Sequence, residues 1–356
     1  MIKVLIIVPR FGTIHRGLET YVKEFISNID TNKFDITVLS AHHNEKFENI
    51  KFKKYHILNR EKFDWIFKCK VFRKLLSYFN IYGSSDFEAL SLMYKSTSFL
   101  KENEFDLILP FGGFWSFYCL NKIINKEKTK IISVGHASVV KKEILQADYF
   151  VALTPFAYKE SSQIINKNKI VLIPNGVDTN KFNQIKTQNI KKIILCVAAF
   201  SSDKNHIALL NALTLMHQDT ELILVGKGPL EGVLKKHPVC KTHNVIFKSA
   251  SLSEMPEIYK KATIFTLPSP EEAFGIVFLE ALASGLNVVA HKAPRQEYVI
   301  GDNGFYCDVF DANKYANTLQ KAFNTEQVIK NIQQAEKFSW KRIALQYEDF
   351  FHKNSK

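Results

Sequence analysis

The chain has 356 residues, of which 48 are Lys or Arg and 35 are Asp or Glu, and its formal net charge at pH 7 is +13. This length favours two domains over one core, and the 46% hydrophobic and 13% aromatic content excludes a disordered chain. The positive charge favours anionic partners, but lysine is spread along the chain without a basic tail or a nucleic-acid motif, so no nucleic-acid partner is expected.

Cysteine usage and the apolar segments indicate a cellular location. Five scattered cysteines (Cys69, Cys119, Cys196, Cys240 and Cys307) lack C-x-x-C spacing, which favours reduced thiols and argues against a zinc site. The apolar N-terminal run is too short for a signal peptide, and no apolar stretch approaches the roughly 20 residues of a membrane-spanning helix. We expect a cytoplasmic protein, and attachment to the inner face of the plasma membrane stays open.

The N-terminal segment predicts a strand at residues 3–8, a loop that contains Gly12 and Gly17, and a helix at about residues 18–29. The backbone N–H groups at the start of such a helix can bind phosphate. The loop is therefore a candidate anion site. The alternative is that both glycines only permit a turn.

A basic and aromatic stretch follows the second predicted strand, residues 35–40. Residues 46–101 look irregular, and residues 53–79 (KKYHILNREKFDWIFKCKVFRKLLSYF) alternate Lys and Arg with bulky apolar side chains. A helix there would be basic on one side and aromatic on the other, like a helix that lies on anionic lipid. The commoner outcome for such a pattern is a core helix with a solvated face, and both interpretations remain open.

Further strands are predicted at residues 106–109, 130–134 and 149–153, and His136 follows the second of them next to Gly135. A lone histidine is more often structural, but one at the end of a strand is a candidate site residue. The second half predicts strands at residues 192–197, 221–225 and 245–248. The G-x-G after residue 225 lacks the third glycine of a dinucleotide site, so we read it as a tight turn.

Residues 265–290 predict a strand, a loop, a helix at residues 276–283 and another strand. The loop carries Glu272 and Gly275, and the helix carries Glu280. The N–H groups of Ile276 and Val277 would open the helix and could bind a phosphate. Two carboxylates beside an anion site suit a molecule with a central diphosphate, a ribose at one end and a sugar at the other. The alternative is a solvated loop acid and a surface helix acid.

The segment PSPEEAFGIVFLEALASGLNVVA resembles the signature PS-x-x-E-G-F-G-x-x-x-x-E-A-x-A-x-G-x-P-V-V of glycosyltransferase family 4, the glycosyl transferases group 1. Ala273 replaces the first glycine and Asn287 the proline. The resemblance implies an α/β protein with the GT-B fold, two Rossmann-like parallel-sheet domains facing a central cleft. It implies an acceptor-binding domain at residues 1–173, a donor-binding domain at residues 174–339, and a helix at residues 340–356 that crosses back to the first domain.

The resemblance also implies roles for individual residues. The implied catalytic residues are Glu272, Lys204 and His136, and the implied donor-binding residues are Gly17, Phe274, Gly275, Ile276, Val277, Glu280, Ser249 and Leu252. Ala199 stands where the family usually has an arginine that clamps the diphosphate. Arg16, at a usual glycine position, and Arg295 are therefore candidates for the missing cation, and Arg16 is also a candidate for holding an anionic acceptor.

What the resemblance implies in function is transfer of a sugar from a nucleotide-diphosphate sugar to a hydroxyl of a glycan or lipid-linked acceptor. Retention at the anomeric carbon, a role in cell-surface polysaccharide assembly and contact with an anionic membrane are expected. The chain has no D-x-D triplet, so no metal or other cofactor is expected. The alternatives are a catalytically silent binding or scaffold protein, a nucleotide-sugar epimerase or phosphorylase, and a two-domain sugar-binding receptor.

Overall fold

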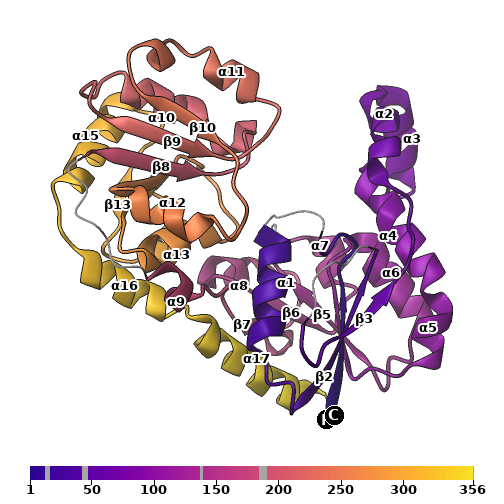
Figure 1. Cartoon of the computed structure of the whole chain (residues 1–356). Coiled ribbons are helices and arrows are strands. Elements are labelled where there is room, and N and C mark those ends of the chain that lie inside the picture. Colours follow the sequence, from indigo (N-terminus) through magenta and orange to yellow (C-terminus); the bar gives the residue numbers. More distant parts are fainter. Residues whose placement is uncertain (13–16, 42–46, 137–138, 184–190, 356) are drawn as a thin grey trace. The chain divides into compact units, whose positions relative to one another are not determined.

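The computed structural model describes residues 1–12, 17–41, 47–136, 139–183 and 191–355. These residues divide into two compact units. The N-terminal unit comprises Met1–Ile173 and Ala344–Lys356, and the C-terminal unit comprises Pro174–Ile343. Each unit is an α/β layer structure built on one sheet (Figure 1).

The N-terminal unit contains a parallel seven-stranded sheet with the order β3-β2-β1-β4-β5-β6-β7. Its strands are β1 (Ile2–Ile7), β2 (Phe34–Ser40), β3 (Lys51–Lys54), β4 (Leu107–Pro110), β5 (Lys130–Val134), β6 (Tyr149–Ala152) and β7 (Ile170–Leu172). Residues 4–7 of β1 are fully buried. A central parallel strand is covered by helices on both faces, which is why β1 reads as one continuous apolar run.

The helices of this unit follow the strands in the βαβ manner. They are α1 (Gly17–Asn28), α2 (Asp64–Lys68), α3 (Lys70–Tyr78), α4 (Ser84–Lys95), α5 (Thr97–Glu102), α6 (Phe114–Ile123), α7 (Lys141–Ile144) and α8 (Pro155–Ser161), with the short helices η1 (Arg60–Lys62) and η2 (Lys167–Lys169). The prediction that residues 46–101 are irregular is wrong, because they form β3 and four α-helices. No residue of α2 or α3 is buried, which contradicts the alternative of a core helix there.

The C-terminal unit contains a parallel six-stranded sheet with the order β10-β9-β8-β11-β12-β13. Its strands are β8 (Ile193–Val197), β9 (Glu221–Val225), β10 (Val245–Lys248), β11 (Ile264–Leu267), β12 (Asn287–His291) and β13 (Phe305–Cys307). Its helices are α9 (Thr179–Phe182), η3 (Ser202–Lys204), α10 (His206–Leu213), α11 (Glu231–Lys235), η4 (Pro238–Lys241), α12 (Met255–Lys261), α13 (Ile276–Ala283), α14 (Pro294–Ile300), α15 (Ala312–Phe323) and α16 (Val328–Glu336). The predicted α/β class with two parallel-sheet domains is therefore confirmed.

The last helix, α17 (Trp340–Asn354), contributes residues to both units. Its first residue packs its indole on Gly176, where a Cβ atom would lie 2.5 Å from the ring. Its later turns bury Tyr347 and Phe351 in the N-terminal unit. Glu348 is also buried there and accepts hydrogen bonds from the Asp30 N–H (3.1 Å) and from Lys33 Nζ (3.0 Å).

A search of the described residues found no helix with the length and apolar content needed to span a membrane.

Replacing Phe351 with alanine should destabilise the N-terminal unit by about 3–5 kcal/mol, because the ring is fully buried against Phe25 and Phe34. Urea unfolding followed by near-UV circular dichroism measures the loss. The matched control is Leu345→Ala in the same helix, whose side chain is 54% exposed and whose loss should change stability by less than about 0.5 kcal/mol. Equal shifts for both variants would contradict the packing of α17.

Candidate functional site

The order of strands places two loops of the C-terminal unit side by side. The order reverses between β8 and β11, which are neighbours in the sheet although β9 and β10 lie between them in sequence. In parallel α/β sheets, ligands bind beyond the carboxyl ends of the strands at such a reversal. The loop after β8 carries Lys204, and the loop after β11 carries Glu272.

Lys204 and Glu272 form an ion pair at this point. Lys204 Nζ lies 2.6 Å from Glu272 Oε1 and 3.3 Å from Asp203 Oδ2. Both side chains of the closer pair are largely shielded from water, with exposed fractions of 22% and 12%. Burial opposes the lysine charge, but the attraction of Glu272 and Asp203 outweighs it and holds the pKa of Lys204 above its usual value. Lys204 is therefore an ammonium at neutral pH.

The helix that follows Glu272 begins at a left-handed glycine. Gly275 has φ of 82°, and a Cβ atom there would lie 2.5 Å from the Phe278 ring. The predicted helix at Ile276–Ala283 is confirmed as α13. Its first N–H groups, those of Ile276 and Val277, have no carbonyl acceptor within the helix. They carry the positive end of the helix dipole, which suits an anion.

The side chain of Phe274 is part of the core of the C-terminal unit. Its side chain is 2% exposed and packs its ring 6.0 Å from the ring of Phe338. The prediction that Phe274 binds the donor is therefore not supported for the side chain, because the ring points into the core. Phe274 instead fixes the loop that precedes Gly275.

Glu280 lies inside the C-terminal unit. It is 8% exposed, and its Oε2 accepts a 2.7 Å hydrogen bond from the hydroxyl of Tyr259 in α12. The alternative of a surface helix acid is therefore wrong. Burial, together with the charge of Glu280, raises the pKa of Tyr259, so this tyrosine remains a hydroxyl donor. No sequence pattern indicated Tyr259. This residue precedes Glu280 by 21 positions and lies in another helix, α12, so only the packing of the two helices brings the two side chains together.

Arg295 and Arg16 are the candidates for the cation that Ala199 does not supply. Ala199 is exposed in the loop after β8. Arg295 lies half-buried in the first turn of α14, and the next residue, Gln296, donates to the carbonyls of Ser269 (3.3 Å) and Pro270 (3.2 Å) in the loop after β11. The start of α14 therefore contacts the loop that carries Glu272. Arg16 lies outside the described residues.

Two further predicted donor-binding residues follow β10. Ser249 is exposed and Leu252 is half-buried, in the loop between β10 and α12. This loop leaves the same carboxyl end of the sheet as the loop after β8, because all six strands are parallel. Among the residues that the structure describes, no group of three or more His, Cys, Asp or Glu side chains converges to hold a metal ion.

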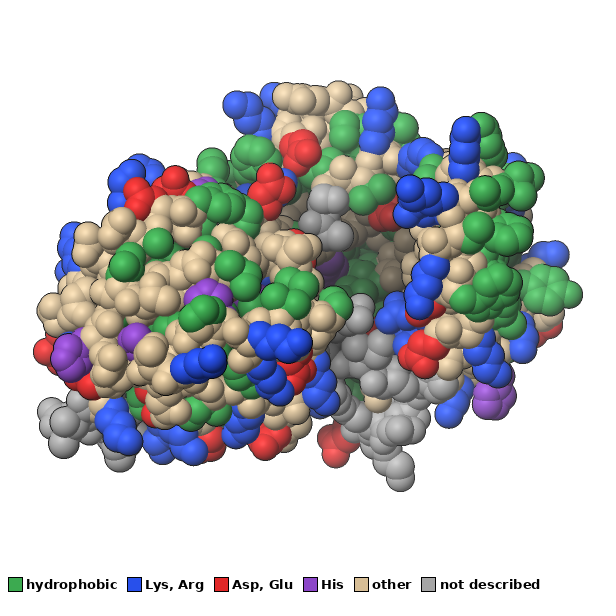
Figure 2. All heavy atoms as spheres, turned by 90° about the horizontal axis from the view of Figure 1, so that it is seen from above, with side chains coloured by type: hydrophobic (Ala, Val, Ile, Leu, Met, Phe, Trp, Pro, Cys, Tyr) green, Lys and Arg blue, Asp and Glu red, His purple; other side chains and the backbone are tan. Residues whose placement is uncertain are grey.

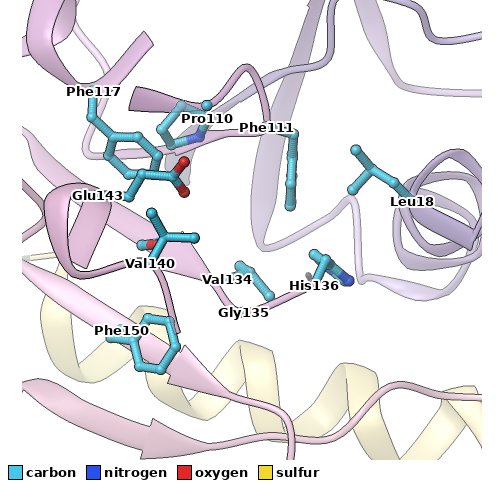
Figure 3. A pocket seen from close by; sticks show the side chains of 12 residues that line it. Leu18, Pro110, Phe111, Phe117, Val134, Gly135, His136, Val140, Glu143 and Phe150 are labelled. Atoms are coloured by element: carbon cyan, nitrogen blue, oxygen red, sulfur yellow. The ribbon is translucent and has the colours of Figure 1, made fainter. Parts of the chain in front are cut away.

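The N-terminal unit has its own strand reversal, between β1 and β4. A cavity of about 200 Å³ opens there, lined by Leu18, Pro110, Phe111, Gly113, Phe117, Ser133, Val134, Gly135, His136, Val140, Glu143 and Phe150. In Figure 3, His136 lies beside Phe111 and opposite Leu18, and the Glu143 carboxylate lies between Phe117 and Pro110. The cavity is thus mainly apolar with a few polar groups, as small-molecule sites are.

His136 is neutral in this cavity. Its ring centroid lies 4.1 Å from that of Tyr21 and 5.4 Å from that of Phe111. Burial lowers the pKa of His136 from 6.5 to about 3. Its Nε2 is buried and has no hydrogen-bond partner within the described part of the chain. An imidazole in this state can exchange one hydrogen bond with a ligand but carries no charge.

Glu143 was not indicated by the sequence. Burial, with a smaller contribution from the negative charge of Asp86, raises the pKa of its carboxyl group.

Gly17, a predicted donor-binding residue, is exposed at the start of α1, and a Cβ atom there would meet nothing within 4 Å. The structure gives no internal reason for a glycine at position 17.

The C-terminal unit is also similar in sequence to a known protein family. Residues 177–338 match the family model described as glycosyl transferases group 1. The C-terminal unit is a glycosyl transferases group 1 domain.

Relatives and solved structures extend the similarity beyond the group 1 domain. An uncharacterised 41.2 kDa protein in the cps region of Klebsiella pneumoniae is 28% identical over 252 residues, 62% of this chain and 70% of that protein. N-acetyl-alpha-D-glucosaminyl L-malate synthase of Bacillus anthracis is 24% identical over 264 residues, 64% and 68% of the two chains. The crystal structure of Anabaena HepE in complex with UDP and glucose matches with a TM-score of 0.75 at 16% identity, covering 99% of this chain and 100% of that chain. This likeness shows the GT-B fold.

Replacing Gly275 with alanine should lower the affinity for a nucleoside diphosphate at least about tenfold and cost about 1–3 kcal/mol of stability, because both the left-handed backbone and the Phe278 ring oppose a Cβ atom. Calorimetric titration and thermal unfolding measure the two effects. Gly232→Ala is the matched control, since a Cβ atom at Gly232 meets nothing within 4 Å in helix α11. Unchanged affinity in Gly275→Ala would contradict an anion site at this helix start.

His136 should make the N-terminal unit less stable in acid. The unfolded chain protonates this histidine near pH 6.5 and the folded chain only near pH 3. Between these values the unfolded state binds more protons, so stability is full above pH 6.5 and falls as the pH drops. From pH 7 to pH 5.5 the loss should be about 1 kcal/mol.

The measurement is urea unfolding of wild type and His136→Gln at both pH values. The variant should lack this part of the pH dependence, because glutamine does not titrate. The same pH dependence in both proteins would show that His136 is not held neutral.

Proposed function

We propose that the protein transfers a sugar from a nucleoside-diphosphate sugar to a hydroxyl of a glycan or lipid-linked acceptor, with retention of the anomeric configuration. The observation that carries the proposal is the Lys204–Glu272 pair beside the free N–H groups of α13. Together they offer one cation, one helix dipole and one carboxylate at the strand reversal. A diphosphate joined to a sugar needs these three elements.

In this proposal the diphosphate binds between Lys204 and the N–H groups of Ile276 and Val277. As the bond between the anomeric carbon and the phosphate oxygen breaks, negative charge grows on the leaving diphosphate. The ammonium group and the helix dipole stabilise that charge, and such fixed groups supply most of the effect of an oxyanion site. The reaction needs no metal ion in this scheme, so turnover should persist in the presence of a chelator.

The two carboxylates bind the ends of the donor rather than attack it. Glu272 accepts hydrogen bonds from sugar hydroxyls, and Glu280 accepts them from the ribose. The existing bonds of these groups support this assignment, since Lys204 and Tyr259 each hold one carboxylate in a fixed orientation. Ser249 and Leu252 would lie against the nucleotide base. Contacts to the base through the backbone of this loop would not reveal, from the sequence, which base is bound.

The acceptor hydroxyl attacks the anomeric carbon on the face from which the diphosphate leaves, which gives retention. The new bond joins the acceptor oxygen to that carbon, and the departing phosphate oxygen takes the acceptor proton. His136 contributes one hydrogen bond from its neutral imidazole, and the cavity beside it is the proposed acceptor site. The name of the Bacillus relative contains an alpha linkage, which is the configuration that a retaining enzyme would form from an alpha-linked donor.

The acceptor class follows from charge. The net charge of +13 favours an anionic or lipid-linked glycan over a neutral one. We also propose that the reaction belongs to cell-surface polysaccharide assembly in the cytoplasm, as the sequence resemblance implies.

A second candidate function rests on Ala199, which carries no charge at the position where the family usually has an arginine. Lys204 is then the cation at this point, and it lies beside two acids, Asp203 and Glu272. If Arg295 and Arg16 supply no further positive charge, the domain would bind nucleotide without transferring sugar. The protein would then act as a binding or scaffold protein.

Replacing Lys204 with alanine should lower the rate of donor turnover about 10²- to 10³-fold, the usual loss for one stabilising group at a developing anion. Ala199→Arg should raise the affinity for nucleoside diphosphate about tenfold, because the exposed position accommodates an arginine that can bind phosphate. Nucleotide release measures turnover, and proton NMR of the product gives its anomeric configuration.

The matched control is Lys235→Ala, which removes an exposed lysine of the same unit that pairs with Glu231. It should leave turnover unchanged. Wild-type turnover in Lys204→Ala, or an inverted product, would contradict the proposed mechanism. Nucleotide binding without any turnover would favour the scaffold function.

A further inference from the structure

Helices α2 and α3 expose an unusual number of large apolar side chains. Residues 64–79, which we call the basic arm, contain Trp65, Val71, Phe72, Leu75, Tyr78 and Phe79, all of them exposed. Val71 and Tyr78 reach 75% exposure. Single exposed apolar residues are normal in proteins, but a contiguous group marks an interaction site.

The apolar residues of α3 form one face of the helix. Val71, Leu75 and Tyr78 follow the spacing i, i+4, i+7, and Phe72 and Phe79 extend the same face by one row. Lys70, Arg73 and Lys74 occupy the opposite side. Toward the right of Figure 2, over these helices, hydrophobic and Lys or Arg side chains lie side by side on the surface.

The base of the basic arm is fixed to the N-terminal unit. The rings of Phe63 and Phe67 lie 5.4 and 5.8 Å from the ring of Phe87 in α4. Asp64 accepts a hydrogen bond from the hydroxyl of Ser84.

The C-terminal end of the arm is also fixed to the N-terminal unit, through the next residue, Asn80. Trp115 Nε1 donates to the carbonyl of Asn80 (3.0 Å), and Lys142 Nζ donates to Asn80 Oδ1 (2.6 Å). These contacts hold the helices in place while their apolar face points away from the core.

Charge identifies the occupant of this face. Residues 64–79 hold four Lys or Arg and one acidic residue. Within the described ranges no salt bridge involves a basic residue of the arm. A second copy of the chain would bring two like-charged faces together, which repel each other.

We propose that the basic arm docks on an anionic lipid surface. Its apolar face enters the boundary between headgroups and acyl chains, where Trp and Tyr rings are favoured. Lys70, Arg73 and Lys74 remain at the level of the headgroup phosphates, because long basic side chains extend toward water. If the proposed function holds, this docking brings the N-terminal unit to lipid-linked acceptors.

The test is co-sedimentation of the full chain with vesicles of phosphatidylcholine alone or with added phosphatidylglycerol. We expect binding to the anionic vesicles at least about tenfold stronger than to the neutral ones, weakened by salt. Trp65 emission should shift to shorter wavelength on binding, and Trp65→Phe should lack the shift.

Two sets of variants separate the apolar and charged contributions. Val71→Ser with Leu75→Ser should abolish binding, and Lys70→Gln with Arg73→Gln and Lys74→Gln should reduce it about tenfold or more and weaken its salt dependence. The matched control, Leu215→Ser with Val233→Ser, removes two similarly exposed residues of the C-terminal unit and should bind like wild type.

No binding of wild type to anionic vesicles would overturn the proposal, and so would equal binding of the Val71→Ser, Leu75→Ser variant. Lipid-free dimers that this variant loses in gel filtration would overturn it too and assign the face to a second copy. Binding of nucleoside diphosphate, measured in parallel, should be the same in all arm variants. If wild type binds no nucleoside diphosphate, this result would contradict the proposed function but would leave the membrane proposal standing.

Discussion

The ion pair between Lys204 and Glu272 joins two loops that lie 68 residues apart in sequence. The loops meet because β8 and β11 are neighbours where the strand order reverses. Ser269 supports the same junction, since its hydroxyl donates to the carbonyl of Asp203 (3.2 Å). The left-handed turn at Gly275 then leads from the loop that carries Glu272 into α13. The chemistry that we assign to the domain depends on these loops staying together.

Charge is distributed differently in the two units. The strand reversal of the C-terminal unit concentrates charged groups, with Lys204 between Asp203 and Glu272. Among the described residues, the lining of the cavity in the N-terminal unit includes no Lys or Arg, and burial lowers the pKa of His136 and raises that of Glu143. The excess of Lys and Arg therefore lies outside this cavity, in part on the basic arm. Such a division suits a protein that binds an anionic donor in one unit and approaches anionic surfaces with the other.

The sequence predicted most strands because central parallel strands are apolar on both faces. It also predicted Gly275 as the residue before α13, since the motif places glycine where φ is positive. It did not predict β3, because Lys51–Lys54 is a charged and mainly exposed edge strand without an apolar pattern. The partners of the site residues were also beyond prediction. Tyr259 reaches Glu280, and Lys204 reaches Glu272, only through tertiary packing.

The central claim is that a nucleoside-diphosphate sugar binds at the junction of these loops. Calorimetric titration of wild type and Glu280→Ala with UDP-, GDP- and ADP-sugars tests it most directly. We predict that wild type binds one of these nucleotides and that Glu280→Ala loses this binding, because in the proposed mechanism the buried carboxylate of Glu280 binds the ribose. If wild type binds none of them, or if Glu280→Ala binds as wild type does, the site is not the donor site.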